Sequence, residues 1–221
     1  VDVIEVENKP TIKIPLGTKL APIKLERVSY NIKRGTVIGD FISDFTGCEI
    51  TDTNVFWRQG RLSGKHLEFE DIFHEVLTAA NFNIVGNPKK LFGRIESFKE
   101  DPIYLVGARV DEIRMNVCDY RMYFFISGIP LPRKIKGRAS IKVTWQVFDL
   151  LKRRIVFEKE TQGSYELKDP RPDGLYVMLN EAFATATSNL GAEKDFVALL
   201  KNDKPSVADI RKLGAVRLAI E

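Results

Sequence analysis

The chain has 221 residues, of which 44% are hydrophobic and 29% charged, a composition typical of folded soluble proteins. Its 34 basic and 30 acidic residues leave a formal charge of only +4, which excludes a concentrated nucleic-acid-binding tail. No run approaches the roughly 20 apolar residues that span a bilayer. The chain begins at Val1 without a methionine, and either a removed signal peptide or lipid-attachment segment or a trimmed chain would explain that start.

Residues 1–34 predict an extended N-terminal arm. Pro10, Pro15 and Pro22 interrupt short β-branched stretches, which favours edge strands over a compact start. We expect the arm to reach a partner. The next stretch, Thr36–Cys48, follows Gly35 and contains Gly39 and Gly47, and no Lys-Ser/Thr pair of a phosphate-binding loop follows them, so it predicts a turn-rich lead-in.

A helix and a long strand are predicted next. Apolar residues recur at helical spacing over Leu67–Ala80, and Asn81 can end this helix. Asn83–Val85 then begins a strand-like return. Ile103–Cys118 reads as a single long strand whose apolar residues change parity partway, so we expect a β-bulge near Asp111.

The connection after this strand is unusually apolar and ends in a basic run. Aromatic residues fill Tyr120–Ile126, and two prolines precede the basic residues. We predict partner contact here, and a loop folded over the core is the alternative. A second basic cluster, 152–154, lies a strand-length away, so the two clusters predict solvated loops more than one nucleic-acid patch. The predicted contact residues are Ile129, Leu131, Arg133, Lys134 and Lys136.

A hairpin and two helices follow. Polar and apolar residues alternate over Ser140–Phe148 and more weakly over Arg154–Tyr165, and the short link predicts antiparallel pairing. Apolar residues recur at helical spacing over Leu175–Leu190, and Gly191 is well placed to end that helix. Glu193–Lys201 predicts another helix.

The predicted fold class is α+β: a mostly antiparallel sheet with helices packed on one face, plus the extended N-terminal arm. We expect the α+β domain to occupy residues 35–201. The remaining residues, 202–221, predict a tail with a short helix from Ser206 and a final strand at Ala215–Ile220.

The chain offers few groups for catalysis. Its only cysteines, Cys48 and Cys118, lack the spacing of a zinc or thioredoxin-like motif, so a disulfide and two thiols both remain open. The only histidines, His66 and His74, belong to no recognisable triad or zinc site. Glu70 and His74 are four residues apart on a predicted helix, a spacing typical of an ordinary surface pair. We therefore expect no catalytic residues, no metal and no cofactor.

Four segments carry a family resemblance: Leu67–Phe92, Tyr104–Cys118, Ala139–Glu166 and Asp173–Leu200. Together they resemble an envelope-associated module that precedes trypsin-like peptidase domains in some bacterial proteins. The chain lacks the GDSGG nucleophile segment and its His and Asp partners, so the resemblance does not imply protease activity. The order of elements is also similar to periplasmic α/β domains of envelope machines, such as the curli export channel and the N-terminal domain of the Tol translocation protein.

These resemblances imply that the protein is a non-enzymatic scaffold subunit of an outer-membrane secretion complex. We expect that complex to be of the Dot/Icm (type IVB) kind. Its partners would be other protein subunits in a higher-order assembly, with no nucleic acid. It would lie in the periplasm or at the periplasmic face of a bacterial outer membrane, with outer-membrane association through a processed N-terminus. The alternative is a periplasmic ligand-binding or regulatory module of an envelope enzyme, with a pocket formed by Lys142, Thr144 and Gln146 on the wet face of the sheet.

Overall fold

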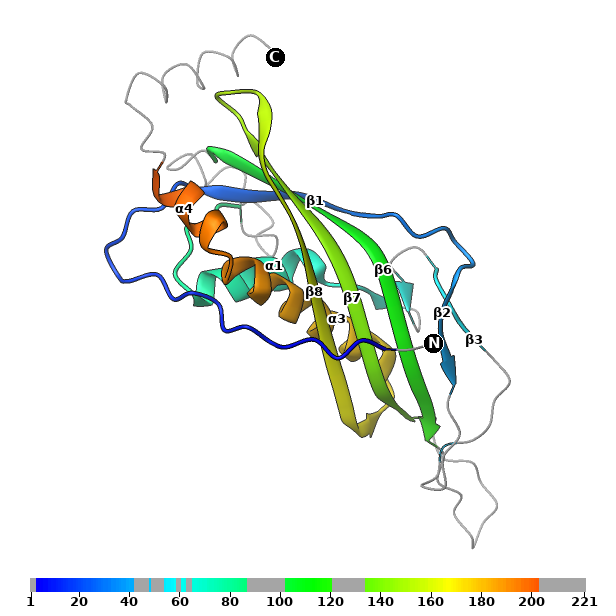
Figure 1. Ribbon diagram of the computed structural model, residues 1–221. Helices are drawn as coiled ribbons and strands as arrows, with labels where there is room; N and C mark the ends of the chain where they lie inside the picture. The colour runs from blue at the N-terminus through cyan, green and yellow to red at the C-terminus, as the bar shows by residue number, and fades with distance from the viewer. Residues whose placement is uncertain are drawn as a thin grey trace, which may run out of the picture.

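A computed structural model describes residues 3–41, 48, 54–58, 61–62, 65–86, 102–120 and 134–202. Within these residues, one six-stranded sheet carries the helices on one face, which confirms the predicted α+β class (Figure 1). The sheet contains β1 (Ile23–Tyr30), β2 (Val37–Phe41), β3 (Asn54–Phe56), β6 (Tyr104–Tyr120), β7 (Lys134–Asp149) and β8 (Arg154–Arg171). The other elements are a separate hairpin of β4 (Arg61–Leu62) and β5 (Lys65–His66), and helices α1 (Phe69–Ala79), α3 (Gly174–Gly191) and α4 (Lys194–Asn202).

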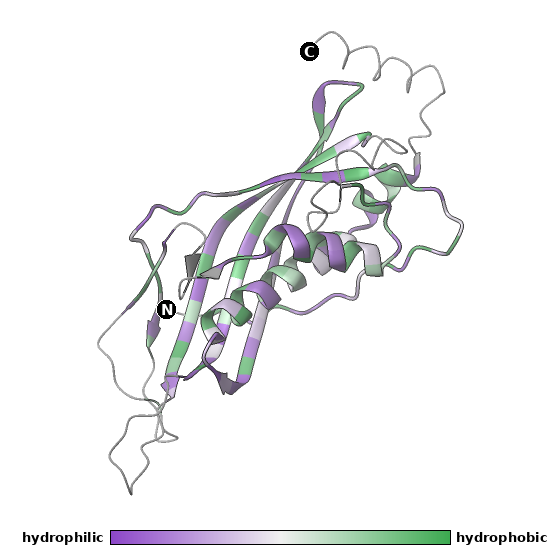
Figure 2. Ribbon diagram, turned by 180° about the vertical axis from the view of Figure 1, so that it is seen from behind, coloured by the Kyte–Doolittle hydropathy of each residue, from purple (hydrophilic) through white to green (hydrophobic). Residues whose placement is uncertain are grey.

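The centre of the sheet is a three-stranded antiparallel meander of β6, β7 and β8. The predicted hairpin is confirmed, but both of its strands are longer than the sequence pattern indicated. β7 begins six residues before Ser140, because buried Ile135 and Ala139 continue its alternation among basic residues. Figure 2 shows the alternation of hydrophilic and hydrophobic residues along these strands. It leaves one face for the helices and one for solvent.

Two parallel strands follow one another along the free side of β6. β1 pairs with the first half of β6, and β2 pairs with Met115–Val117. The register between β6 and β7 shifts at Asp111, which confirms the predicted bulge. The turn-rich lead-in predicted for Thr36–Cys48 is wrong over residues 37–41, which form β2. Gly39 permits this pairing, since a Cβ there would lie 2.4 Å from the Met115 carbonyl oxygen.

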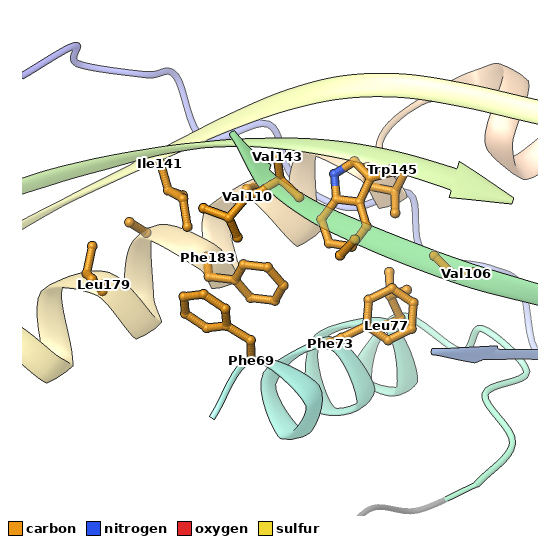
Figure 3. Packing of buried hydrophobic residues seen from close by; sticks show 14 of the residues in the cluster. Phe69, Phe73, Leu77, Val106, Val110, Ile141, Val143, Trp145, Leu179 and Phe183 are labelled. Carbon is orange, nitrogen blue, oxygen red and sulfur yellow. The ribbon is translucent and has the colours of Figure 1, made fainter. Parts of the chain in front are cut away.

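The core lies between the meander and helices α1 and α3 (Figure 3). Phe69 of α1 stacks on Phe183 of α3 with ring centroids 4.1 Å apart, and Trp145 of β7 lies 5.6 Å from Phe183. All three side chains are at most 2% exposed. Burying each contributes about 1.5–3 kcal/mol, so this cluster fixes both helices on the sheet.

The helix ends follow the sequence in two cases and depart from it in one. Asn81 adopts φ 64° just after α1, as expected of a residue that ends a helix, and α4 matches its prediction within one residue. The prediction for Gly191 is wrong, because it is still helical and Ala192 caps α3. Gly191 instead allows close approach, since a Cβ there would lie 2.4 Å from Thr11 Cγ2. The strand-like return after α1 is reduced to one bridge, from Ile84 to Ile23.

The predicted N-terminal arm is extended before β1, but it lies along the domain. Its backbone bonds to α3 through Ile12 N–H and the Gly191 carbonyl (3.2 Å), and Ile14 is only 1% exposed. Figure 1 shows this blue segment crossing in front of β8 and β7. Because β1 is part of the sheet, the sheet includes strands from both sides of the predicted boundary at residue 34. Of the tail predicted for 202–221, Asn202 ends α4, and the rest, with its short helix from Ser206 and its strand at Ala215–Ile220, lies outside the described residues.

Candidate interaction surfaces

The predicted partner-contact residues lie at the end of the β6–β7 hairpin. Ile129, Leu131 and Arg133 are outside the described residues. Lys134 and Lys136 are the first outward residues of β7, and the Lys136 ammonium lies 5.4 Å from the centre of the Tyr120 ring. The aromatic ring of Tyr120 thus orients one of the two lysines.

The two basic clusters lie at opposite ends of β7. That strand has 16 residues, so its ends are about 50 Å apart at about 3.4 Å per residue. Part of this charge is neutralised locally, because Arg138 pairs with Glu166 at 3.1 Å and Lys152 pairs with Asp149 at 3.1 Å. As predicted, the clusters do not form one patch.

A hydrogen-bond network occupies the wet face around Asp111. Thr144 donates to its carboxylate at 2.6 Å, Arg109 Nε at 2.7 Å and Asn31 at 3.3 Å. Burial alone would raise the pKa of Asp111, but these hydrogen bonds and the Arg109 charge outweigh burial and lower the pKa. The network ties the loop after β1 to β6 and β7.

The polar residues predicted to form a ligand pocket bind their neighbours instead. Lys142 pairs with Glu160 at 3.4 Å, and Gln146 donates to Glu158 at 2.6 Å. The depression beside Lys142 has a volume of about 10 Å³, which is barely enough for one water molecule. The structure therefore gives the ligand-binding alternative no support at this place.

The two cysteines form a disulfide. Cys48 and Cys118 are joined by an S–S bond of 2.02 Å that spans 70 residues of sequence, and both residues are at most 6% exposed. Cys48 also bridges to Tyr120 at the end of β6. The disulfide thus anchors the chain after β2 near the end of β6, next to the parallel pairing of β2 with Met115–Val117.

An acidic groove lies between β1 and the first turn of α1. Its volume is about 320 Å³. Burial, followed by the negative charge of Glu70, raises the pKa of Tyr30 in its wall to about 12. The residues that line the groove are Val28, Tyr30, Leu67, Glu68, Phe69, Glu70 and Asp71.

Glu68 is held in place by α3. Its backbone N–H donates to the Asn180 side chain at 3.3 Å. Burial, and then a hydrogen bond with the Glu68 carboxylate, raise the pKa of the Tyr176 hydroxyl. We infer that this side of the groove has a fixed shape. Sequence reasoning missed the groove; its only signal was three carboxylates at the start of a predicted helix, in LEFED.

The two histidines lie on different elements: His66 is on β5, and His74 is on α1, one turn after Glu70. Among the residues that the structure describes, no group of three His, Cys, Asp or Glu is placed to hold a metal ion. None of the described helices is long and apolar enough to cross a membrane.

Comparisons with known proteins give weak structural likenesses only. No family model and no curated protein matches the chain. A Xanthomonas campestris protein of the DUF330 family is 10% identical, with 88% of this chain and 94% of that chain covered and a TM-score of 0.42. A Helicobacter pylori homologue of neuraminyllactose-binding hemagglutinin is also 10% identical, with 91% and 94% covered and a TM-score of 0.41. A Caulobacter crescentus protein described as a candidate lipoprotein is 14% identical, with 63% and 88% covered and a TM-score of 0.34. Likenesses at this level carry no statement about function.

Proposed function

We propose that this protein is a non-enzymatic structural subunit of a bacterial cell-envelope assembly, in the periplasm or at the periplasmic face of the outer membrane. The disulfide between Cys48 and Cys118 carries the proposal. Disulfides form and persist in oxidising compartments such as the bacterial periplasm, and they are rare in the cytosol. The sequence resemblance to envelope modules points to the same compartment.

A structural role fits the polar groups that the structure describes on the wet face. Lys142, Gln146 and Asp111 all bind neighbouring side chains, which stiffens the meander. The end of the β6–β7 hairpin, with Lys134 and Lys136, is the proposed contact with other subunits. The assembly we propose is the outer-membrane core of a secretion system of the Dot/Icm type.

Crosslinking of the native protein in envelopes, followed by pull-down and mass spectrometry, tests this proposal. We expect stoichiometric recovery with subunits of a secretion complex. Recovery of the protein alone, from a soluble fraction, would contradict it. Charge reversal at Lys134 and Lys136 should lower the yield of partners, whereas reversal at Arg153 and Arg154, at the opposite end of β7, should not.

A further inference from the structure

Among the residues that the structure describes, nothing pairs with one edge of β1 over most of its length. Over Leu25–Tyr30, β1 pairs with β6 and with no other described strand. At its start the open edge already accepts a parallel neighbour: Ile23 N–H donates to the Asn83 carbonyl at 3.0 Å, and Val85 N–H donates to the Ile23 carbonyl at 2.9 Å. The last hydrogen bond of this pairing is made by Val85, and Gly86, with a φ of 81°, is the last described residue of the segment. The remaining edge is a template for another extended segment.

The acidic groove lies beside this open stretch. Val28 and Tyr30 of β1 form one wall, and the first turn of α1 forms the other. Since the groove holds about 320 Å³, a long side chain from a segment paired with β1 can enter it.

The charges in the groove select the kind of side chain. Within the described part of the chain, none of Glu68, Glu70 and Asp71 forms an ion pair, whereas Glu112 and Glu160 on the wet face do so at 2.6 and 3.4 Å. Three unneutralised carboxylates favour a positive charge. The half-buried Tyr30 also lines the groove, and its aromatic ring attracts cations.

We propose that an extended segment of a neighbouring subunit pairs with the open edge of β1 and places a lysine or arginine in this groove. Main-chain hydrogen bonds would supply affinity, and the carboxylates would supply specificity. The inference deepens the proposed function and rests on it for the existence of the neighbouring subunit.

The opposite edge of the sheet is less suited to strand addition. On β8, Ser164 binds the N-terminal arm, and Asn189 of α3 bonds both the arm and the Gln162 carbonyl. Charged residues lie on both edges, Glu26 and Arg27 on β1 and Glu158, Lys159 and Glu160 on β8, so the arm on β8 is the feature that distinguishes the two edges.

A synthetic peptide titrated into the full chain tests the proposal. The probe is an acetylated, amidated peptide of alternating threonine and valine with one central lysine. We expect it to shift the backbone amide signals of β1 and of the first turn of α1 in NMR spectra. A peptide with glutamate in place of the lysine, and one with proline beside the lysine, should shift neither, because the first has the wrong charge and the second cannot complete the pairing.

Matched variants separate the groove from the overall charge. Glu70→Gln with Asp71→Asn should weaken peptide binding at least about tenfold, while Glu158→Gln with Glu160→Gln removes the same charge from β8 and should not. Circular dichroism and urea unfolding would verify that both double variants fold.

Several outcomes would overturn the proposal: absence of binding at about 1 mM lysine peptide, equal binding of the glutamate peptide, or shifts confined to β8. Concentration-dependent shifts of the same β1 amides without peptide would place a second copy in the groove and overturn the partner assignment.

The envelope pull-down separates the groove proposal from the proposed scaffold function. Equal recovery of partners by wild type and the Glu70→Gln, Asp71→Asn variant would refute the groove and leave the scaffold role. Peptide binding at the groove without co-purification would refute the scaffold role and leave the groove.

Discussion

The hydroxyl group of Ser164 on β8 bonds both backbone groups of Val6 in the N-terminal arm. It accepts a hydrogen bond from Val6 N–H at 2.9 Å and donates one to the Val6 carbonyl at 3.3 Å. On the neighbouring helix α3, the side chain of Asn189 accepts a hydrogen bond from Lys9 N–H at 2.8 Å and donates one to the Gln162 carbonyl at 2.8 Å. Side chains thus replace a strand partner here, and the arm covers part of an otherwise open sheet edge.

Replacement of Ser164 by alanine should release the start of the arm. The variant loses both bonds to Val6, each worth about 1 kcal/mol, while the core stays intact. We expect faster hydrogen exchange over residues 3–9, measured by mass spectrometry, with unchanged exchange in β6. Ser29→Ala is the matched control, since Ser29 bonds the Ala108 carbonyl and not the arm. Unchanged exchange of the arm in Ser164→Ala would contradict the role assigned to the hydroxyl.

Reduction of the disulfide should destabilise the protein. In the chain-entropy model, a crosslink between Cys48 and Cys118, 70 residues apart, contributes about 4 kcal/mol by restricting the unfolded chain. Urea unfolding with and without reductant should show a loss of that order. The Cys48→Ala, Cys118→Ala double variant should be weakened to a similar degree, and reductant should not change it further. A wild-type midpoint that does not respond to reductant would rule out this contribution.

The sequence predicted the parts of the fold that local patterns determine. Alternation along β7, helical spacing along α1 and α3, and the parity change at Asp111 each depend on residues close in sequence. The parallel pairing of β1 and β2 with β6 was missed, because β1 meets a strand about 80 residues later and no local signal encodes that partner.

The candidate site could be predicted only in pieces. The acidic start of α1 is visible in the sequence, but the groove also needs Tyr30 on β1, and so its prediction requires the missed parallel pairing. The cysteines were recognised as a candidate pair, whereas their contact depends on where the chain after β2 meets the end of β6. Sequence patterns do not give distances between such segments.

The Trp145 indole should depend on Thr161 for its hydrogen bond. Trp145 Nε1 donates to Thr161 Oγ1 at 2.7 Å, and this hydroxyl donates to the Ala186 carbonyl at 2.8 Å, all in the core. Thr161→Val keeps the shape but leaves the indole N–H unsatisfied, at a cost of about 1–3 kcal/mol in urea unfolding. In a double-mutant cycle with Trp145→Phe, the coupling should be about 1 kcal/mol. Strict additivity would show that the bond does not stabilise the protein.

Gly163 should tolerate no side chain. A Cβ at this position of β8 would lie 2.0 Å from the Ala182 carbonyl oxygen and 2.4 Å from Ala186 N, both in the backbone of α3. Gly163→Ala must displace the helix, so we expect a loss of about 1–3 kcal/mol or more in the free energy of unfolding. Gly107→Ala on β6 is the control, since its nearest atom would be 4.0 Å away, and it should change stability by less than about 1 kcal/mol. Similar losses for the two variants would contradict the close approach of α3.

Protonation of Asp111 should weaken the protein in acid. Its pKa in the folded protein is lowered from the usual 3.8 because the hydrogen bonds from Thr144, Arg109 and Asn31 outweigh burial. A lowered folded pKa stabilises the folded state above the unfolded pKa, and that stabilisation is lost as the pH falls through the folded pKa. Wild type should therefore be more stable than Asp111→Asn at pH 7, and the gap should close below about pH 4 in urea unfolding. Thr144→Val removes one of these bonds and should move the loss to higher pH. Parallel pH profiles for wild type and Asp111→Asn would show that this carboxylate does not couple protonation to folding.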